Sequence, residues 1–85
     1  MGWVYGTVYS KTKENIGIIA DKVRKANEVD ATSVNFEITR GLYNLVKKNE
    51  TAFKEMMEEL SGVKVVRAEP IDNGDYCLLT IWLKE

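Results

Sequence analysis

The feature of this sequence that most constrains its fold is an Asn-Gly pair, Asn73 and Gly74, between two apolar, strand-like runs at residues 63–69 and 76–83. Asn-Gly in this position is the strongest short-range signal of a β-hairpin. With Asn73 and Gly74 as the two turn residues, Asp72 and Asp75 become direct cross-strand neighbours. The end of the chain is therefore predicted to be a hairpin with an acidic tip.

Two earlier segments, residues 3–9 and 34–38, alternate side chains with a period of two. This period predicts a β-strand in each segment. In the later segment the apolar side chains are Val34, Phe36 and Ile38. In the earlier one, one face carries Val4, Gly6 and Val8, and the other carries Trp3, Tyr5, Thr7 and Tyr9.

Helical spacing connects these strands. A first helix is predicted from a cap at Ser10 or Thr12 to near Asn27, with a buried stripe of Ile16, Ile19, Ala20 and Val23. A second helical region, residues 39–62, begins at a Thr39 cap and ends at Gly62. Its apolar stripe is Leu42, Leu45, Val46, Phe53, Met56, Met57 and Leu60. Cap-like residues at 49–51 interrupt the stripe, so either one helix or two are expected.

These elements predict one α+β domain over residues 1–85. We expect a two-layer β-α-β-α-β-β sandwich in which the helices cover one face of a mixed sheet that ends in the C-terminal hairpin. The predicted buried face of the hairpin carries Val66, Ala68, Cys77, Leu79, Ile81 and Leu83. Its other face carries Val65, Arg67, Glu69, Ile71, Tyr76, Leu78, Thr80 and Trp82.

The 85 residues contain no histidine and one cysteine, Cys77. A single cysteine excludes an internal disulfide and indicates a reducing compartment, for which we expect the cytoplasm. Histidine is the commonest general base and metal ligand, and no nucleophile or phosphate-loop motif takes its place. We therefore expect a protein that is not an enzyme.

Charge and hydropathy indicate where the protein is found and in what kind of organism. The N-terminus lacks a signal-peptide pattern, and no apolar run reaches the length of about eighteen residues that a membrane span needs. The formal net charge is −1, lysine and glutamate dominate, and glutamine is absent. This usage is typical of thermophile proteins.

Acidic side chains at the hairpin tip are the first candidate binding site. Glu69, Asp72 and Asp75, with Asn73 among them, could hold a divalent cation, because a calcium ion would relieve the repulsion between opposed carboxylates. Such a site would be weak, with a dissociation constant of about 10⁻⁴–10⁻³ M. The alternative is ordinary turn chemistry, which favours Asp and Asn without any ligand.

A second acidic candidate lies on the first helix. Glu14, Asp21 and Glu28 recur every seven residues, and Asp30 follows them. The alternative is a solvated face paired with neighbouring lysines.

Aromatic residues define a third candidate surface, an interaction face of Trp3, Tyr5, Tyr9, Tyr76 and Trp82. A homodimer that packs sheet to sheet would bury it, since interfaces are enriched in aromatic residues. The alternatives are cover from the chain's own second helix or from a bend in the sheet, and a platform for nucleic-acid bases.

The predicted β-α-β-α-β-β order, the chain length and the closing hairpin resemble the Alba family of archaeal nucleic-acid-binding proteins. This resemblance implies the same architecture and nucleic-acid binding through basic residues. Here Asp72 and Asp75 make the tip acidic where a DNA-reaching arm would be basic, so nucleic acid is the third expectation. The histidine-free, lysine- and glutamate-rich chain is also similar to small uncharacterised proteins of methanogenic archaea, one group of which is associated with calcium.

The leading expectation is a non-enzymatic binding protein with a weak acidic calcium site. The second is a protein-interaction module or homodimer that uses the aromatic sheet face. Neither a membrane partner nor a cofactor other than calcium is expected.

Overall fold

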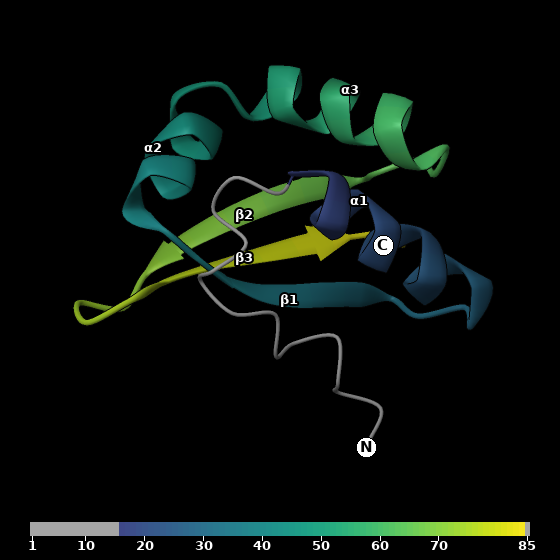
Figure 1. The fold of residues 1–85 in the computed structure, drawn as a ribbon, viewed down its shortest axis with the longest axis horizontal. Coiled ribbons are helices and arrows are strands. Elements are labelled where there is room, and N and C mark those ends of the chain that lie inside the picture. The colour runs from purple at the N-terminus through teal and green to yellow at the C-terminus, as the bar shows by residue number, and fades with distance from the viewer. Residues whose placement is uncertain (1–15, 85) are drawn as a thin grey trace.

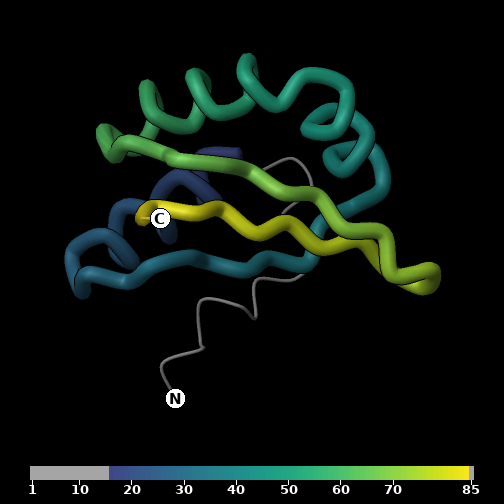
Figure 2. The backbone as a smooth tube through the Cα atoms, turned by 180° about the vertical axis from the view of Figure 1, so that it is seen from behind, coloured from purple at the N-terminus to yellow at the C-terminus, as the bar shows by residue number. Residues whose placement is uncertain are grey.

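The computed structural model describes residues 16–84. Its helices and strands, in chain order, are α1 (Ile16–Glu28), β1 (Ser33–Ile38), α2 (Arg40–Lys48), α3 (Glu50–Ser61), β2 (Arg67–Asp72) and β3 (Cys77–Trp82). The strands form one sheet in the order β1-β3-β2, and the helices lie against one of its faces (Figure 1, Figure 2). The predicted α+β class is confirmed.

The finer prediction is met only in part. All strand pairing within residues 16–84 is antiparallel, so this part of the chain does not contain the parallel pairing that a mixed sheet requires. The predicted first strand at residues 3–9 lies outside the described residues. None of the helices within residues 16–84 has the length and apolar character needed to cross a bilayer.

The predicted helical region at residues 39–62 forms two helices rather than one. Asn49 ends α2 and begins α3: its N–H donates to the Leu45 carbonyl, and its side-chain oxygen accepts the Ala52 N–H at 3.0 Å. The bend divides the predicted stripe. Leu42, Val46, Phe53 and Met57 are buried, whereas Leu45 and Leu60 are half exposed.

The two ends of this helical region have the caps that the sequence predicts. The Thr39 hydroxyl accepts the Leu42 N–H at 3.3 Å, as an N-cap should. Gly62 follows α3 with a φ of +74°, and its N–H donates to the Glu58 carbonyl at 2.8 Å. Both predicted caps are confirmed.

The hairpin turn lies one residue later than predicted. Asp72 pairs with Cys77, not with Asp75, and the Asn73 N–H donates to the Tyr76 carbonyl at 2.9 Å. The two turn residues are therefore Gly74, with a φ of +91°, and Asp75. A positive φ at the first turn residue alone is the pattern of a type II′ turn, which favours glycine there.

This correction shifts the pairing by two residues, so it keeps every strand residue on its predicted face. The core face, which packs on the helices, carries Val34, Phe36, Ile38, Ala68, Pro70, Asp72, Cys77, Leu79 and Ile81. The opposite face, here called the open face, carries Ser33, Asn35, Glu37, Arg67, Glu69, Ile71, Leu78, Thr80 and Trp82.

The start of β2 departs from the prediction because of a β-bulge. Arg67 pairs with Trp82, and the Val66 N–H also donates to the Trp82 carbonyl, so two residues oppose one. The extra residue reverses the alternation before it. Val65 is consequently buried and Val66 only half-buried, the opposite of the predicted faces.

The two glycines at the helix ends give a matched test of this backbone. Gly62→Ala should lower the free energy of unfolding by about 1 kcal/mol, because a side chain disfavours the left-handed conformation. Gly17→Ala should raise the free energy of unfolding by up to about 1 kcal/mol, because Gly17 is helical and a methyl group there meets no atom within 4 Å. Chemical denaturation measures both; equal effects of the two substitutions would contradict the assignment.

Candidate functional site

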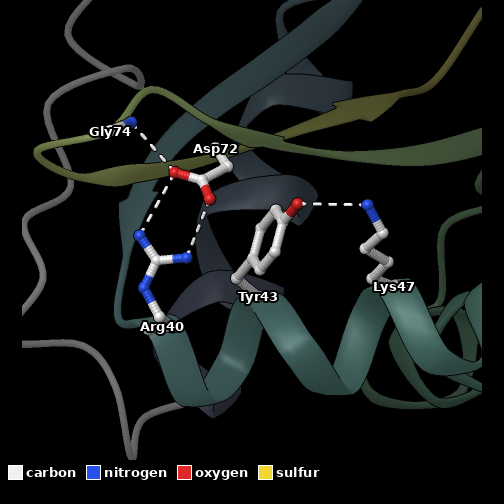
Figure 3. Close-up of polar contacts among 5 residues, drawn as sticks. All are labelled: Arg40, Tyr43, Lys47, Asp72 and Gly74. Carbon is white, nitrogen blue, oxygen red and sulfur yellow. Dashed lines mark hydrogen bonds and ion pairs between the residues drawn. The ribbon is translucent and has the colours of Figure 1, made fainter.

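The hairpin tip is fastened to the start of α2. The two terminal guanidinium nitrogens of Arg40 donate to the two carboxylate oxygens of Asp72 at 2.9 and 3.2 Å, and the Gly74 N–H donates to Asp72 Oδ1 at 2.9 Å (Figure 3). Asp72 lies on the core face at the end of β2, so its carboxylate can reach the helix layer. Both of its oxygens are occupied by these donors.

Tyr43 and Lys47 extend this cluster along α2. The Lys47 ammonium donates to the Tyr43 hydroxyl at 3.3 Å (Figure 3). The Arg40 guanidinium lies 5.7 Å and the Lys47 nitrogen 5.6 Å from the centre of the Tyr43 ring, within the range of cation–π attraction. The surroundings of Asp72 are therefore cationic. These positive charges stabilise the Asp72 carboxylate and disfavour the binding of a metal ion beside it.

The hydrogen bonds from Arg40 are the main reason why the pKa of Asp72 falls from its usual 3.8 to about 2, with a further contribution from the Gly74 N–H. The same ion pair raises the pKa of Arg40. Asp72 therefore stays ionised at pH values at which an unpaired aspartate would already be protonated.

The predicted cation ligands at the tip do not gather into one site. Glu69 lies on the open face and Asp72 on the core face, because an odd number of positions separates them along β2. Asp75 lies in the turn and does not oppose Asp72. Within residues 16–84, no group of three or more carboxylate or thiol side chains is arranged to hold a metal ion.

The acidic residues of the second candidate site do not come together either. Asp21 contacts Arg24 at 2.6 Å and Lys25 at 3.4 Å, and a hydrogen bond from Lys25 is the largest cause of its lowered pKa. Asp30, with a φ of +62°, pairs instead with Lys84. Glu28 is exposed at the end of α1, and Glu14 lies outside the described residues.

A carboxylate that the sequence did not single out, Glu37, lies near the tip. Glu37 and Asp75 line one cavity of about 320 Å³ together with Thr39, Arg40 and Tyr76. They come together because the end of β1 pairs with the start of β3. No local pattern could reveal this proximity, since it depends on the order of the strands.

The open face is a second candidate surface. Its apolar members at the hairpin end are Leu78, which is half-buried, and Ile71, which is 40% exposed; the neighbouring Tyr76 is 43% exposed. Near its centre the Thr80 hydroxyl donates to the Asn35 side-chain oxygen at 2.7 Å. Nothing within residues 16–84 packs over these side chains as a second layer.

Trp82 forms the other end of the open face. The Arg67 guanidinium lies 5.1 Å from the centre of its ring, and the two residues line a cavity of about 290 Å³ with Val66 and Lys84. The indole nitrogen of Trp82 is buried and finds no acceptor among residues 16–84. Two residues of the predicted interaction face, Tyr76 and Trp82, therefore lie at opposite ends of the open face. The other three, Trp3, Tyr5 and Tyr9, lie outside the described residues.

Comparison of the chain with known protein families, with curated proteins and with solved structures gives no match.

The ion pair at the tip can be tested by titration. Arg40→Ala should raise the pKa of Asp72 from about 2 toward 3.8, because its main donor is removed. In the unaltered protein, the folded pKa lies below the unfolded one, so the pair stabilises the fold above about pH 4. This stabilisation is lost as the pH falls through about 2.

Carboxyl carbon shifts, recorded by NMR against pH, measure the change. Arg24→Ala is the control, because Arg24 pairs with Asp21 and leaves Asp72 untouched. An unchanged Asp72 titration in Arg40→Ala would show that the ion pair does not persist in solution.

Proposed function

We propose that this chain is a non-enzymatic binding protein that associates with a second copy of itself through the open face. The observation that carries the proposal is that the helices cover the core face, while two apolar side chains at the hairpin end of the open face, Ile71 and Tyr76, remain 40% and 43% exposed. Apolar side chains grouped on an uncovered face are typical of an interaction surface.

The charges of the open face fit a protein partner better than nucleic acid. Arg67 is its one cation among the described residues, and it stacks on Trp82, while Glu37 and Glu69 supply two carboxylates. A phosphate backbone needs several cations in a row. A face that combines a few apolar side chains with charges of both signs is instead suited to a protein partner.

Self-association is favoured by where these charges lie. Arg67 and Glu37 occupy opposite corners of the open face, on the two outer strands. A two-fold pairing of two such faces can bring Arg67 of one copy over Glu37 of the second copy. The apolar residues then meet in the same interface, and an acceptor from the second copy could satisfy the Trp82 indole.

Charge introduced among the apolar side chains at the hairpin end of this interface should weaken the dimer. We expect the unaltered protein to dimerise as its concentration rises, and Ile71→Asp to weaken the dimer by about tenfold or more, which is ~1.4 kcal/mol or more. Sedimentation velocity over a range of concentrations measures the change. Leu45→Asp is the matched control, because Leu45 is a half-exposed apolar residue on the helix side.

An unaltered protein that stays monomeric at millimolar concentration would overturn the proposal. Loss of the dimer in Leu45→Asp but not in Ile71→Asp would place the interface on the helices instead.

Calcium binding is the second candidate function, and the shared cavity of Glu37 and Asp75 is the observation that favours it. Arg40 lines the same cavity, but Asp72 already pairs with its charge. Two carboxylates, the Thr39 hydroxyl and water molecules would supply fewer protein ligands than a dedicated site. A dissociation constant of about 10⁻⁴–10⁻³ M is the expected strength.

A calcium titration followed by amide shifts tests this candidate. The shifts should concentrate at Glu37 and Asp75, and Asp75→Asn should abolish them, because it removes one of the two charges. Asp21→Asn is the control, since Asp21 lies in α1 and pairs with Arg24 and Lys25. Uniform small shifts, equal to those caused by sodium chloride, would rule the site out.

For residues 1–85, the predicted β-α-β-α-β-β order, with its first strand at residues 3–9 and its second helix divided at Asn49, remains our proposal.

A further inference from the structure

The two outer edges of the sheet differ in how they are protected. At β2, the Ala68 N–H, which points away from β3, is taken by the Glu50 carboxylate at 3.0 Å. Pro70, two positions later on the same side, has no N–H to offer. The bulge at Val66 and Arg67 twists the start of this edge. Each of these features prevents another strand from pairing with β2.

Among residues 16–84, none of these features protects the outer edge of β1. The Leu83 and Lys84 N–H groups donate to the Thr32 carbonyl at 2.8 and 3.3 Å, so alternate residues from Thr32 onward direct their backbone groups toward β3. Ser33, Asn35 and Glu37 therefore direct theirs outward. Within residues 16–84, β1 pairs with β3 alone.

The position of α1 determines from which direction a preceding strand would arrive. α1 has 13 residues and β1 has six, so both are about 20 Å long. α1 packs on β1 and a short link joins Glu28 to Ser33, so α1 runs back along β1. Its start at Ile16 therefore lies toward the end of β1, where a strand parallel to β1 would also finish.

We propose that the open edge of β1 is the docking site for residues 3–9 of the same chain, paired parallel to β1 with α1 as the crossover. Six residues, 10–15, join that segment to α1, and parallel neighbours require a crossover of this kind. The alternation of residues 3–9 suits the position. Its Val4, Gly6, Val8 side continues the core face, and its aromatic side continues the open face.

This inference goes beyond the proposed dimer and does not depend on it. If it holds, Trp3, Tyr5 and Tyr9 lie beside Ser33, Asn35 and Glu37. The open face then gains a fourth strand and about a third more width, at ~4.8 Å per strand.

Amide hydrogen exchange in the full chain tests the docking. The Asn35 and Glu37 amides should exchange at least about a hundredfold more slowly than in an unpaired edge strand. In a parallel pair these residues bond to positions 4, 6 and 8 of the neighbour. Val8→Pro should therefore abolish the protection, since it removes an inward N–H.

Thr7→Pro is the matched control, because the Thr7 N–H would point to solvent and its loss should leave the protection intact. The Leu79 amide, in the central strand, reports whether each variant is folded. Protection lost in Thr7→Pro but kept in Val8→Pro would indicate antiparallel pairing and overturn the proposal.

The dependence of amide protection on protein concentration distinguishes residues 3–9 from other occupants of this edge. Protection that does not change on dilution supports pairing within one chain. Protection that disappears on dilution would assign the edge to a second copy instead, and rapid exchange of Asn35 and Glu37 at every concentration would show that nothing docks there. Ile71→Asp separates this test from that of the dimer. If the Asn35 and Glu37 amides stay protected in this variant when it is monomeric, the docking does not depend on dimerisation.

Discussion

The pairing between β2 and β3 is the constraint on which the rest of the structure depends. β3 is the central strand, so its register with β2 and with β1 decides which side chains meet the helices. A slip of one residue would turn Leu79 and Ile81 outward and bring Leu78, Thr80 and Trp82 into the core. The burial of Leu79 and Ile81 therefore holds the register more firmly than the turn does.

This explains why the sequence predicted the faces well and the tip poorly. Alternation determines which residues share a face, and Val34, Phe36 and Ile38 are buried as expected. Turn chemistry allowed either Asn73 and Gly74 or Gly74 and Asp75 as the turn pair, and the structure adopts the second. The supposed opposition of Asp72 and Asp75 rested on the first.

Long-range geometry explains the remaining differences. The bulge at Val66 and Arg67 exchanges the positions of Val65 and Val66, and it depends on pairing with Trp82. The bidentate contact between Arg40 and Asp72 joins residues far apart in the sequence. Glu37 reaches the cavity at the tip only because β1 lies next to β3. None of these contacts leaves a local pattern, whereas the caps at Thr39 and Gly62 are local and were predictable.

Glu50 shows how one side chain can link folding to solubility. It is the first residue of α3, where a carboxylate favours the helix dipole, and the same carboxylate covers the Ala68 N–H on the outer edge of β2. Loss of that carboxylate would leave the Ala68 N–H without its acceptor and the edge with Pro70 and the bulge as its remaining protection. The consequence would be seen as a greater tendency to aggregate in a concentrated sample, before any change in the shape of the single molecule.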